Sequence, residues 1–203
     1  PSALNNIQFD LVAENTDGVP DHTNLDLKTF RMNFGQNPVV GSLTIAGLRD
    51  GYIKSDLIAK VKLQDLEQIF PPDSVFMSGD LDFALKADGE YKGSLTSIHA
   101  KGKHWLQMQV PAFQLSLKLT DGLFKYDHLP ESISDINFHL NARHDGGTLD
   151  RTNVAMEKLE ARLGDNPLKG FIHLTGFRNP VINSELTARL DLSTLPKFLP
   201  MEG

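Results

Sequence analysis

Cysteine is absent from the 203 residues, and the chain has only one tryptophan and three tyrosines. Without cysteine there is no disulfide framework, no thiolate metal ligand and no thiol nucleophile, and the redox compartment stays undecided. No stretch approaches the roughly 20 consecutive apolar residues of a membrane-spanning helix. The sequence starts at Pro1 without a charged-then-apolar leader, so we expect no signal peptide and regard the chain as an internal segment of a longer protein.

Positive charge is also scarce. The 20 Lys and Arg residues are outnumbered by 26 Asp and Glu, which gives a net charge of −6. Proteins that bind DNA or RNA usually present a basic patch, so we expect no nucleic-acid partner. With 40% hydrophobic and 23% charged residues, the composition is that of a folded chain and excludes a disordered or collagen-like one.

Alternation of apolar and polar residues is the main structural signal. From Ile53 to Leu63 every second residue faces one side, while Lys54, Asp56 and Lys60 face the other, and Ile58 is the apolar exception. Such a period of two is typical of strands with one wet face, and it predicts antiparallel rather than buried parallel sheets. The same alternation recurs in the segments 81–87, 113–120 and 136–142.

Turn and helix signals separate these runs. Helical signal is confined to two short stretches near 64–70 and 193–199, which Pro71 and Pro200 close. The sequence therefore predicts an all-β fold: a long, antiparallel, strongly twisted sheet that forms an open groove, with these two short helices. We predict turns at Asp17-Gly18, Asn37-Pro38, Asp50-Gly51, Asp88-Gly89, Asp121-Gly122 and Gly146-Gly147.

The sequence also repeats itself. Residues 7–71 align with residues 136–200 at a constant offset of 129 without a gap, and about one position in three is identical. Residues 72–135 contain further alternating runs. We therefore predict one elongated β domain over residues 1–203, built of internal repeats that stack on their neighbours.

Few residues suggest catalysis or metal binding. The seven histidines show no metal-binding spacing, and we expect them at the solvated surface. The set Asp21-x-Thr23-Asn24 recurs as Asp150-x-Thr152-Asn153, which is compatible with calcium but is more typical of side chains that cap turns. Nucleophile elbows, phosphate-binding loops and dinucleotide fingerprints are absent. We expect no enzyme, no metal and no cofactor.

The apolar face of such strands must be covered by a second sheet, by helices or by a ligand. Helices are too few, so a closed β-sandwich and an open lipid-filled groove remain, with a transmembrane barrel ranked last because aromatic girdles are missing. A dispersed hydrolase site is a further, weaker alternative. For the groove, we predict these lining residues: Ile7, Phe9, Leu11, Leu43, Ile45, Ile53, Leu57, Val61, Leu81, Phe83, Leu85, Phe113, Leu115, Leu117, Ile136, Phe138, Leu140, Ile172, Leu174, Ile182, Leu186 and Leu190.

Several loose motifs resemble those of AsmA-like proteins. The resemblance covers nearly the whole chain and rests on patterns of Gly, Pro, Asn and alternating apolar residues. The matching segments are Gly79 to Gly89, Gly93-Ser-Leu, Leu129-Pro130, Ile133 to Phe138, Leu163 to Pro167, Gly170-x-Ile172, Asn179-Pro180-x-Ile182 and Leu190 to Leu195.

This resemblance implies a function and a place. AsmA-like proteins are similar to TamB and to bridge-like lipid transfer proteins, which have an inner-membrane anchor and a long periplasmic β-groove bent like a taco shell. The resemblance thus implies a periplasmic segment of an inner-membrane-anchored protein of a diderm bacterium, acting in outer-membrane biogenesis. It implies phospholipid or another acyl lipid as partner, membrane association through segments outside this chain, and periplasmic or outer-membrane protein partners. The alternative is a structural or adhesive β-sandwich that binds a protein or a glycan.

Overall fold

The computed structural model describes residues 4–66, 75–92, 109–126 and 131–189. Within these ranges the protein is almost entirely strand, with one short helix, α1 (Leu63–Leu66), and two 3-10 turns, Pro20–His22 and Leu149–Arg151. The strands are β1 (Leu4–Glu14), β2 (Asn24–Phe34), β3 (Asn37–Ala46), β4 (Asp50–Lys62), β5 (Val75–Lys92), β6 (Gln109–Val110), β7 (Ala112–Tyr126), β8 (Ile133–His144), β9 (Gly147–Thr148), β10 (Thr152–Leu163), β11 (Asn166–Thr175) and β12 (Val181–Ala188).

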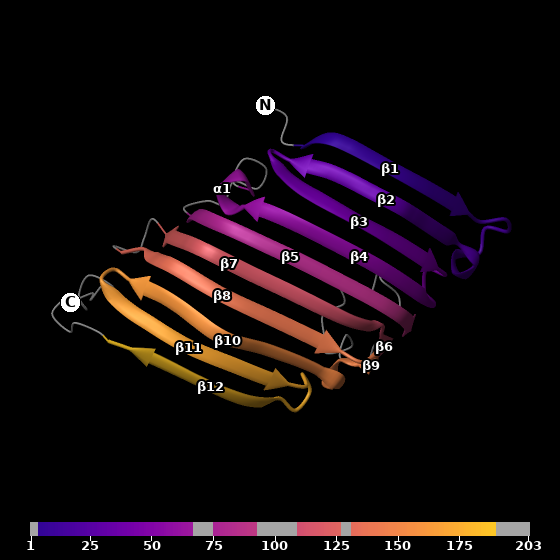
Figure 1. Ribbon diagram of the computed structural model, residues 1–203. Coiled ribbons are helices and arrows are strands. Elements are labelled where there is room, and N and C mark those ends of the chain that lie inside the picture. Colours follow the sequence, from indigo (N-terminus) through magenta and orange to yellow (C-terminus); the bar gives the residue numbers. More distant parts are fainter. Residues whose placement is uncertain (1–3, 67–74, 93–108, 127–130, 190–203) are drawn as a thin grey trace, which may run out of the picture.

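All the strands of the described residues belong to one antiparallel, 12-stranded sheet (Figure 1). The order is β1-β2-β3-β4-β5-β7-β8-β10-β11-β12, with the short β6 and β9 beside this path. Each long strand therefore pairs with the next long strand along the chain. The sheet is open, with β1 at one edge and β12 at the other. The predicted all-β, antiparallel fold is confirmed, and the described residues include no second sheet that would make a sandwich.

Opposite charges match across β4 and β5, two neighbouring strands near the middle of the sheet. On the polar face, β4 and β5 pair Lys54 with Asp88, Asp56 with Lys86 and Lys60 with Asp82. The corresponding nitrogen–oxygen distances are 3.9, 3.4 and 3.7 Å. Exposed ion pairs contribute at most about 1 kcal/mol each, so their main effect is to disfavour a slipped register. A slip by one residue would also turn the apolar side chains to the wrong face.

Bulges recur at the offset of the repeat. The register of β2 shifts between Leu27 and Phe30, and the register of β10 shifts between Met156 and Leu159. These two pairs of positions are 129 residues apart. A bulge inserts a residue into a strand and interrupts its alternation. The alternation of apolar and polar residues is therefore interrupted in β2 and β10, although both strands carry apolar side chains.

Hairpin corners also recur at this offset. The Gly47 N–H donates to the Thr23 carbonyl at 2.8 Å, and the Gly176 N–H donates to the Thr152 carbonyl at 2.9 Å. Asp21 accepts a hydrogen bond from the Arg49 backbone N–H at 3.0 Å. Its counterpart Asp150 likewise accepts from the Arg178 backbone N–H at 2.6 Å. The repeated Asp-x-Thr-Asn set thus caps turns, and the described residues contain no cluster of metal-ligating side chains.

Helix α1 is held by a buried asparagine. Asn37 donates to the Phe34 carbonyl at 2.8 Å and to the Asp65 carboxylate at 2.6 Å, and it accepts from the Lys62 N–H at 3.0 Å. One side chain therefore ties the β2–β3 hairpin to the end of β4 and to α1. The helix predicted near 64–70 is present from Leu63 to Leu66. Its remainder and the whole of the helix predicted near 193–199 lie outside the described residues.

Four of the predicted turns fall on strand residues. Asn37-Pro38 and Asp50-Gly51 are the first residues of β3 and β4, directly after the actual turns. The other two are further from a turn. Asp88-Gly89 lies inside β5 and Asp121-Gly122 lies inside β7. Asp121 has a φ of 51°, and the register shifts around it. A Cβ on Gly122 would lie 2.7 Å from Leu119 Cδ2 and 2.9 Å from Ile136 Cβ. Glycine is required there because neighbouring side chains approach the backbone closely, not because the chain reverses.

The buried core is small for this length of chain. Because a single sheet has no second layer, most apolar side chains in the described residues stay partly exposed. Those that are buried are Phe34, Ile45, Ala59, Tyr91, Leu119, Ala142 and Ala161.

Tyr91 lies near the end of β5 and contacts the loop between β3 and β4. Its hydroxyl donates to the Gly47 carbonyl, and burial, followed by the charges of Asp21 and Asp50, raises its pKa. We expect Tyr91→Phe to destabilise the fold by about 1 kcal/mol. The stability due to the neutral phenol is fully present below the unfolded pKa and is lost as pH rises through the higher folded pKa. Melting temperatures between neutral and alkaline pH should therefore fall more steeply for wild type than for Tyr91→Phe.

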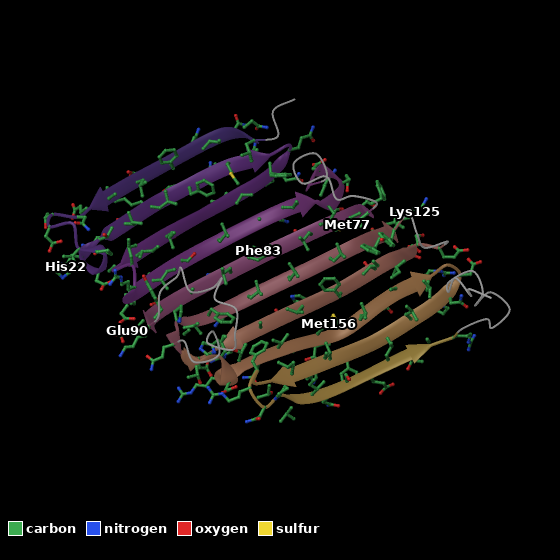
Figure 2. All side chains as sticks on the ribbon, turned by 180° about the vertical axis from the view of Figure 1, so that it is seen from behind. His22, Met77, Phe83, Glu90, Lys125 and Met156 are labelled. Carbon is green, nitrogen blue, oxygen red and sulfur yellow. The ribbon has the colours of Figure 1, made fainter. Side chains whose placement is uncertain are left out.

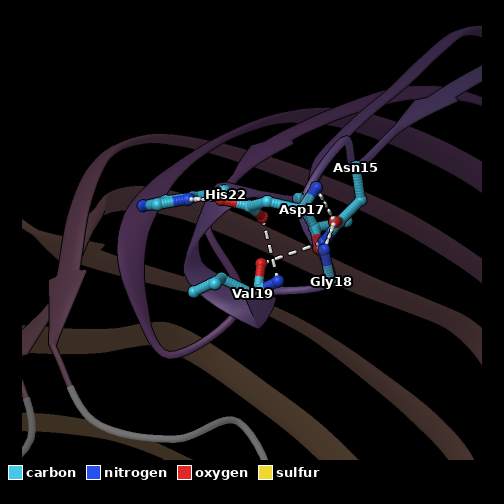
Figure 3. A network of polar contacts seen from close by, with 6 residues as sticks. Asn15, Asp17, Gly18, Val19 and His22 are labelled. Atoms are coloured by element: carbon cyan, nitrogen blue, oxygen red, sulfur yellow. Dashed lines mark hydrogen bonds and ion pairs between the residues drawn. The ribbon is translucent and has the colours of Figure 1, made fainter.

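Polar contacts order the loop between β1 and β2 (Figure 3). Asn15 Oδ1 accepts from the Gly18 N–H at 2.6 Å, and Asp17 Oδ1 accepts from the Val19 N–H at 2.9 Å. His22 Nδ1 lies 2.5 Å from Asp17 Oδ2. The hydrogen bond from His22, followed by that from Val19, lowers the pKa of Asp17.

The lowered pKa of Asp17 predicts an acid-sensitive loop. The stabilisation is present above the unfolded carboxyl pKa and is lost as pH falls through the lower folded pKa. We expect the Gly18 and Val19 amides to lose hydrogen-exchange protection in that acid range. Asp17→Asn should show weak protection at every pH, and an unchanged pH profile in this variant would contradict the assignment.

Candidate functional site: the apolar face of the sheet

The register places most of the apolar side chains on one face, which we call the apolar face. Directly paired residues of antiparallel strands point to the same side, so the pairing can be followed from strand to strand. One row across the middle of the sheet consists of Ala59, Phe83, Leu117, Leu140, Met156 and Ile172. A neighbouring row consists of Phe9, Phe30, Gly41, Leu57, Leu85, Leu115, Ala142, Val154, Leu174 and Ile182.

Figure 2 shows side chains on the sheet, with Phe83 and Met156 within its span and Glu90 and Lys125 near the ends of the strands. Exposure increases towards the two edges of the sheet. Phe9 on β1 is 64% exposed and Leu186 on β12 is 67% exposed, whereas Phe83 and Leu117 are half-buried by their neighbours. The apolar face is thus open to solvent or ligand in the described part of the protein.

The dimensions of this face can be derived from strand geometry. From Ile53 to Val61 the apolar side chains of β4 span eight residue steps, or ~26 Å at ~3.3 Å per residue. Ten long strands at ~4.8 Å spacing extend the face by ~43 Å in the other direction. The surface is long enough to take an extended acyl chain in either direction.

The structure brings together almost all the predicted lining residues. Those within the described ranges lie on the apolar face, in pairs such as Leu57 with Leu85 and Leu117 with Leu140. Ile7 is the exception, because it lies where a bulge interrupts the β1–β2 register, although its side chain is exposed. Leu190 lies outside the described residues. That these side chains contact lipid remains a prediction.

Sequence reasoning missed a second set of residues on this face. They lie mainly in β2 and β10, where the bulges interrupt the alternation. The offset of 129 could have found them, because it aligns Leu27 and Phe30 with Met156 and Leu159. The missed residues are Leu25, Leu27, Phe30, Met32, Val154, Met156, Leu159 and Leu168.

A buried polar pair lies at one end of the apolar face. His144 is 1% exposed, so the prediction of a solvated surface histidine is wrong for this residue. Its Nδ1 lies 3.0 Å from Thr152 Oγ1, and its ring stacks on Phe113 with centroids 5.3 Å apart. No hydrogen-bond partner of His144 Nε2 is found among the described residues. The neighbouring strands explain the burial, because their pairing places Phe113 and Thr152 on either side of the ring.

The opposite face is polar and contains a hollow of about 460 Å³. Ala84 and Ala155 lie along it with Ser116 and Asn141, and Lys86 and Arg143 border it. His139 Nε2 lies 2.9 Å from Ser116 Oγ at an exposed position. Nucleophilic catalysis by such a pair requires a third group that orients the histidine. The contacts of His139 in the described residues include no carboxylate, so this pair alone does not form a catalytic triad.

Known proteins give no further indication of function. No family model matches the sequence, and neither the curated proteins nor the solved structures contain a significant match. The described residues also include no helix long and apolar enough to cross a membrane. The apolar face is therefore the feature of the described residues that bears most directly on function.

Proposed function

We propose that this chain is a non-catalytic segment of a lipid-conducting groove, in which the apolar face shields the acyl chains of a phospholipid or another acyl lipid. The observation that carries the proposal is the single sheet with one apolar and one polar face. Soluble proteins rarely leave a large contiguous apolar surface without an occupant. In the described residues neither a second sheet nor a helix layer covers this one.

Burial of an acyl chain on this face is energetically sufficient for binding. Removing each CH₂ from water contributes about 0.8 kcal/mol, so a 16-carbon chain contributes up to about 12 kcal/mol before the loss of chain freedom is subtracted. One side of the bound chain stays exposed on an open sheet, which lowers this figure. Half of it, about 6 kcal/mol, corresponds to a dissociation constant of roughly 40 μM.

The same face is suited to movement of the lipid. Neighbouring rows carry similar aliphatic and aromatic side chains, so a chain that slides by one row exchanges one set of apolar contacts for another. The head group can remain in water at the open side. No nucleophile, general base or cofactor takes part in such a step, and we propose no enzymatic activity.

Place and partners belong to the same proposal. The resemblance to AsmA-like proteins supports a periplasmic location within an inner-membrane-anchored protein of a diderm bacterium. Outer-membrane biogenesis is then the process served. Membrane contact would come from segments outside this chain, and periplasmic or outer-membrane proteins are the expected protein partners.

A fluorescent fatty acid tests the proposal directly. We expect titration into the 203-residue chain to give saturable binding with increased probe fluorescence, and non-fluorescent phospholipid to displace the probe. A chain that is folded by circular dichroism and does not bind the probe would contradict the groove. That result would favour the structural or adhesive alternative, for which the polar hollow bordered by Lys86 and Arg143 offers a surface for a protein or a glycan.

A further inference from the structure

The hollow on the polar face has a floor of short side chains. It crosses β5, β7, β8 and β10, and strand pairing places Ala84, Ser116 and Ala155 in one row along it. The next row on the same face carries longer side chains, which line the hollow along one side: Lys86, Gln114, Arg143 and Asn153. Its volume of about 460 Å³ lies within the ~300–1,000 Å³ that is typical of small-molecule sites.

Amide side chains in this hollow are available to a ligand. No hydrogen-bond partner of the Gln114 or Asn141 side chain is found among the described residues. A third amide, that of Asn153, accepts a hydrogen bond from Thr175 Oγ1 at 2.9 Å through its oxygen, so its NH₂ group can donate to a ligand. An amide both donates and accepts, as a hydroxyl group does. The three amides therefore favour a ligand that carries several hydroxyl groups.

The charged side chains that line this hollow are both cations. Lys86 and Arg143 line it and no carboxylate of the described residues does, although the chain has a net charge of −6. Arg143 uses Nε for Asp145 at 2.9 Å, so its terminal nitrogens can pair with a carboxylate or a phosphate. Lys86 Nζ lies 3.4 Å from the Asp56 carboxylate, and such an exposed ion pair is weak enough to exchange for a ligand anion.

A smaller hollow of about 260 Å³ adjoins the larger one. It shares Lys86, Gln114 and Arg143 with the larger hollow and adds Asp88 and Asp145. Carboxylates accept hydrogen bonds from hydroxyl groups, whereas they repel a second anion. The two hollows together therefore match a ligand with an anionic group at one end and hydroxyl groups at the other.

We propose that these two hollows bind an acidic saccharide, that is, a sugar with one carboxylate or phosphate group. Arg143 and Lys86 pair with the anionic group in the larger hollow, and the amides of Gln114 and Asn141 hydrogen-bond the hydroxyl groups. The short side chains of the floor leave room for the sugar ring. Because this site lies on the face opposite to the apolar face, it does not rest on lipid binding, and both faces can be occupied together.

NMR titration of the 203-residue chain tests the site, with the side-chain amide resonances of Gln114 and Asn141 as reporters. The probes are glucose-6-phosphate and glucuronic acid. Glucose, which lacks the charge, and inorganic phosphate, which lacks the ring, are the controls. We expect both acidic sugars to shift the two resonances saturably in the millimolar range, and each control to bind about threefold to fivefold more weakly. The tighter of the two acidic sugars identifies the preferred anionic group.

Two lysine variants form a matched pair for this test. Lys86 and Lys60 both lie on the polar face with side chains 67% and 70% exposed, and each pairs with an aspartate of the neighbouring strand at 3.4 and 3.7 Å. Only Lys86 lines the hollows. We expect Lys86→Gln to weaken glucose-6-phosphate binding about threefold to fivefold, and Lys60→Gln to leave it unchanged. Ala155→Leu should abolish binding, because its side chain would fill the floor.

Any one of three results would overturn the proposal. These are the absence of a saturable shift with either acidic sugar, binding of glucose or inorganic phosphate as tight as that of the acidic sugars, and equal losses in Lys86→Gln and Lys60→Gln. Fatty-acid binding should be the same in both lysine variants as in wild type, because neither lysine lies on the apolar face. A chain that binds fatty acid and no acidic sugar would therefore overturn this site alone.

Discussion

Leu57→Asp should lower the affinity for a fatty acid at least about tenfold. The variant places a carboxylate on the apolar face, and the bound acyl chain would remove this charge from water. Leu57 lies in a central row between Gly41 and Leu85. Transfer of an unpaired polar or charged group into apolar surroundings costs several kcal/mol. The measurement is a titration with a fluorescent fatty acid, together with the melting temperature of each variant.

Ile58→Asp is the matched control. Ile58 is the next residue of the same strand, it is 52% exposed, and it points to the polar face. The chemical change is the same, so the two variants differ mainly in the face that receives the charge. We expect Ile58→Asp to bind the probe like wild type. Equal loss of binding in both folded variants would contradict the assignment of the two faces.

A second matched pair separates binding from folding. Leu186 and Glu185 are neighbours on the exposed strand β12, and Leu186 is 67% exposed on the apolar face. We expect Leu186→Asp to keep the fold, since little burial is lost, and to weaken binding at this edge. Glu185→Leu should leave binding nearly unchanged. Unfolding by Leu186→Asp would indicate that this side chain belongs to a packed interior.

The second large effect concerns stability. Asn37→Ala should destabilise the fold by about 3 kcal/mol, because it removes three hydrogen bonds at a buried position and leaves the Phe34 carbonyl and the Lys62 N–H without this partner. For a domain of this size we expect a fall in melting temperature of about 6–12 °C. The neighbouring Gln36 is exposed, so Gln36→Ala should change the melting temperature by less than about 2 °C. Similar shifts in the two variants would show that Asn37 does not anchor α1.

The regular parts of the fold could be predicted from the sequence, because one physical rule governs them. In β4, β5 and β7 each residue alternates between water and the apolar face, so the period of two is nearly unbroken. The turns Asp17-Gly18 and Gly146-Gly147 follow equally simple rules, since their glycines adopt positive φ angles of 76°, 88° and 98°. The lining residues of these strands could be named in advance for the same reason.

The irregular parts could not be predicted, because they depend on contacts across the sheet. A doublet such as Lys28-Thr29 gives no sign that it is the bulge between Leu27 and Phe30. Gly122 resembles a turn residue in the sequence, yet the approach of Leu119 and Ile136 explains it. The burial of His144 depends on Phe113 and Thr152, which lie on two other strands. The sequence around His144 therefore gives no sign that this histidine is buried.

Native mass spectrometry of the chain, purified from a host that contains membranes, tests the lipid-conducting groove most directly. We expect a protein peak with adducts of the mass of a phospholipid or another acyl lipid, and lipid extraction should identify the same molecules. Leu57→Asp should lose most of these adducts, whereas Ile58→Asp should keep them. A folded wild-type chain that carries no lipid, and that acquires none when phospholipid vesicles are added, would contradict the central claim.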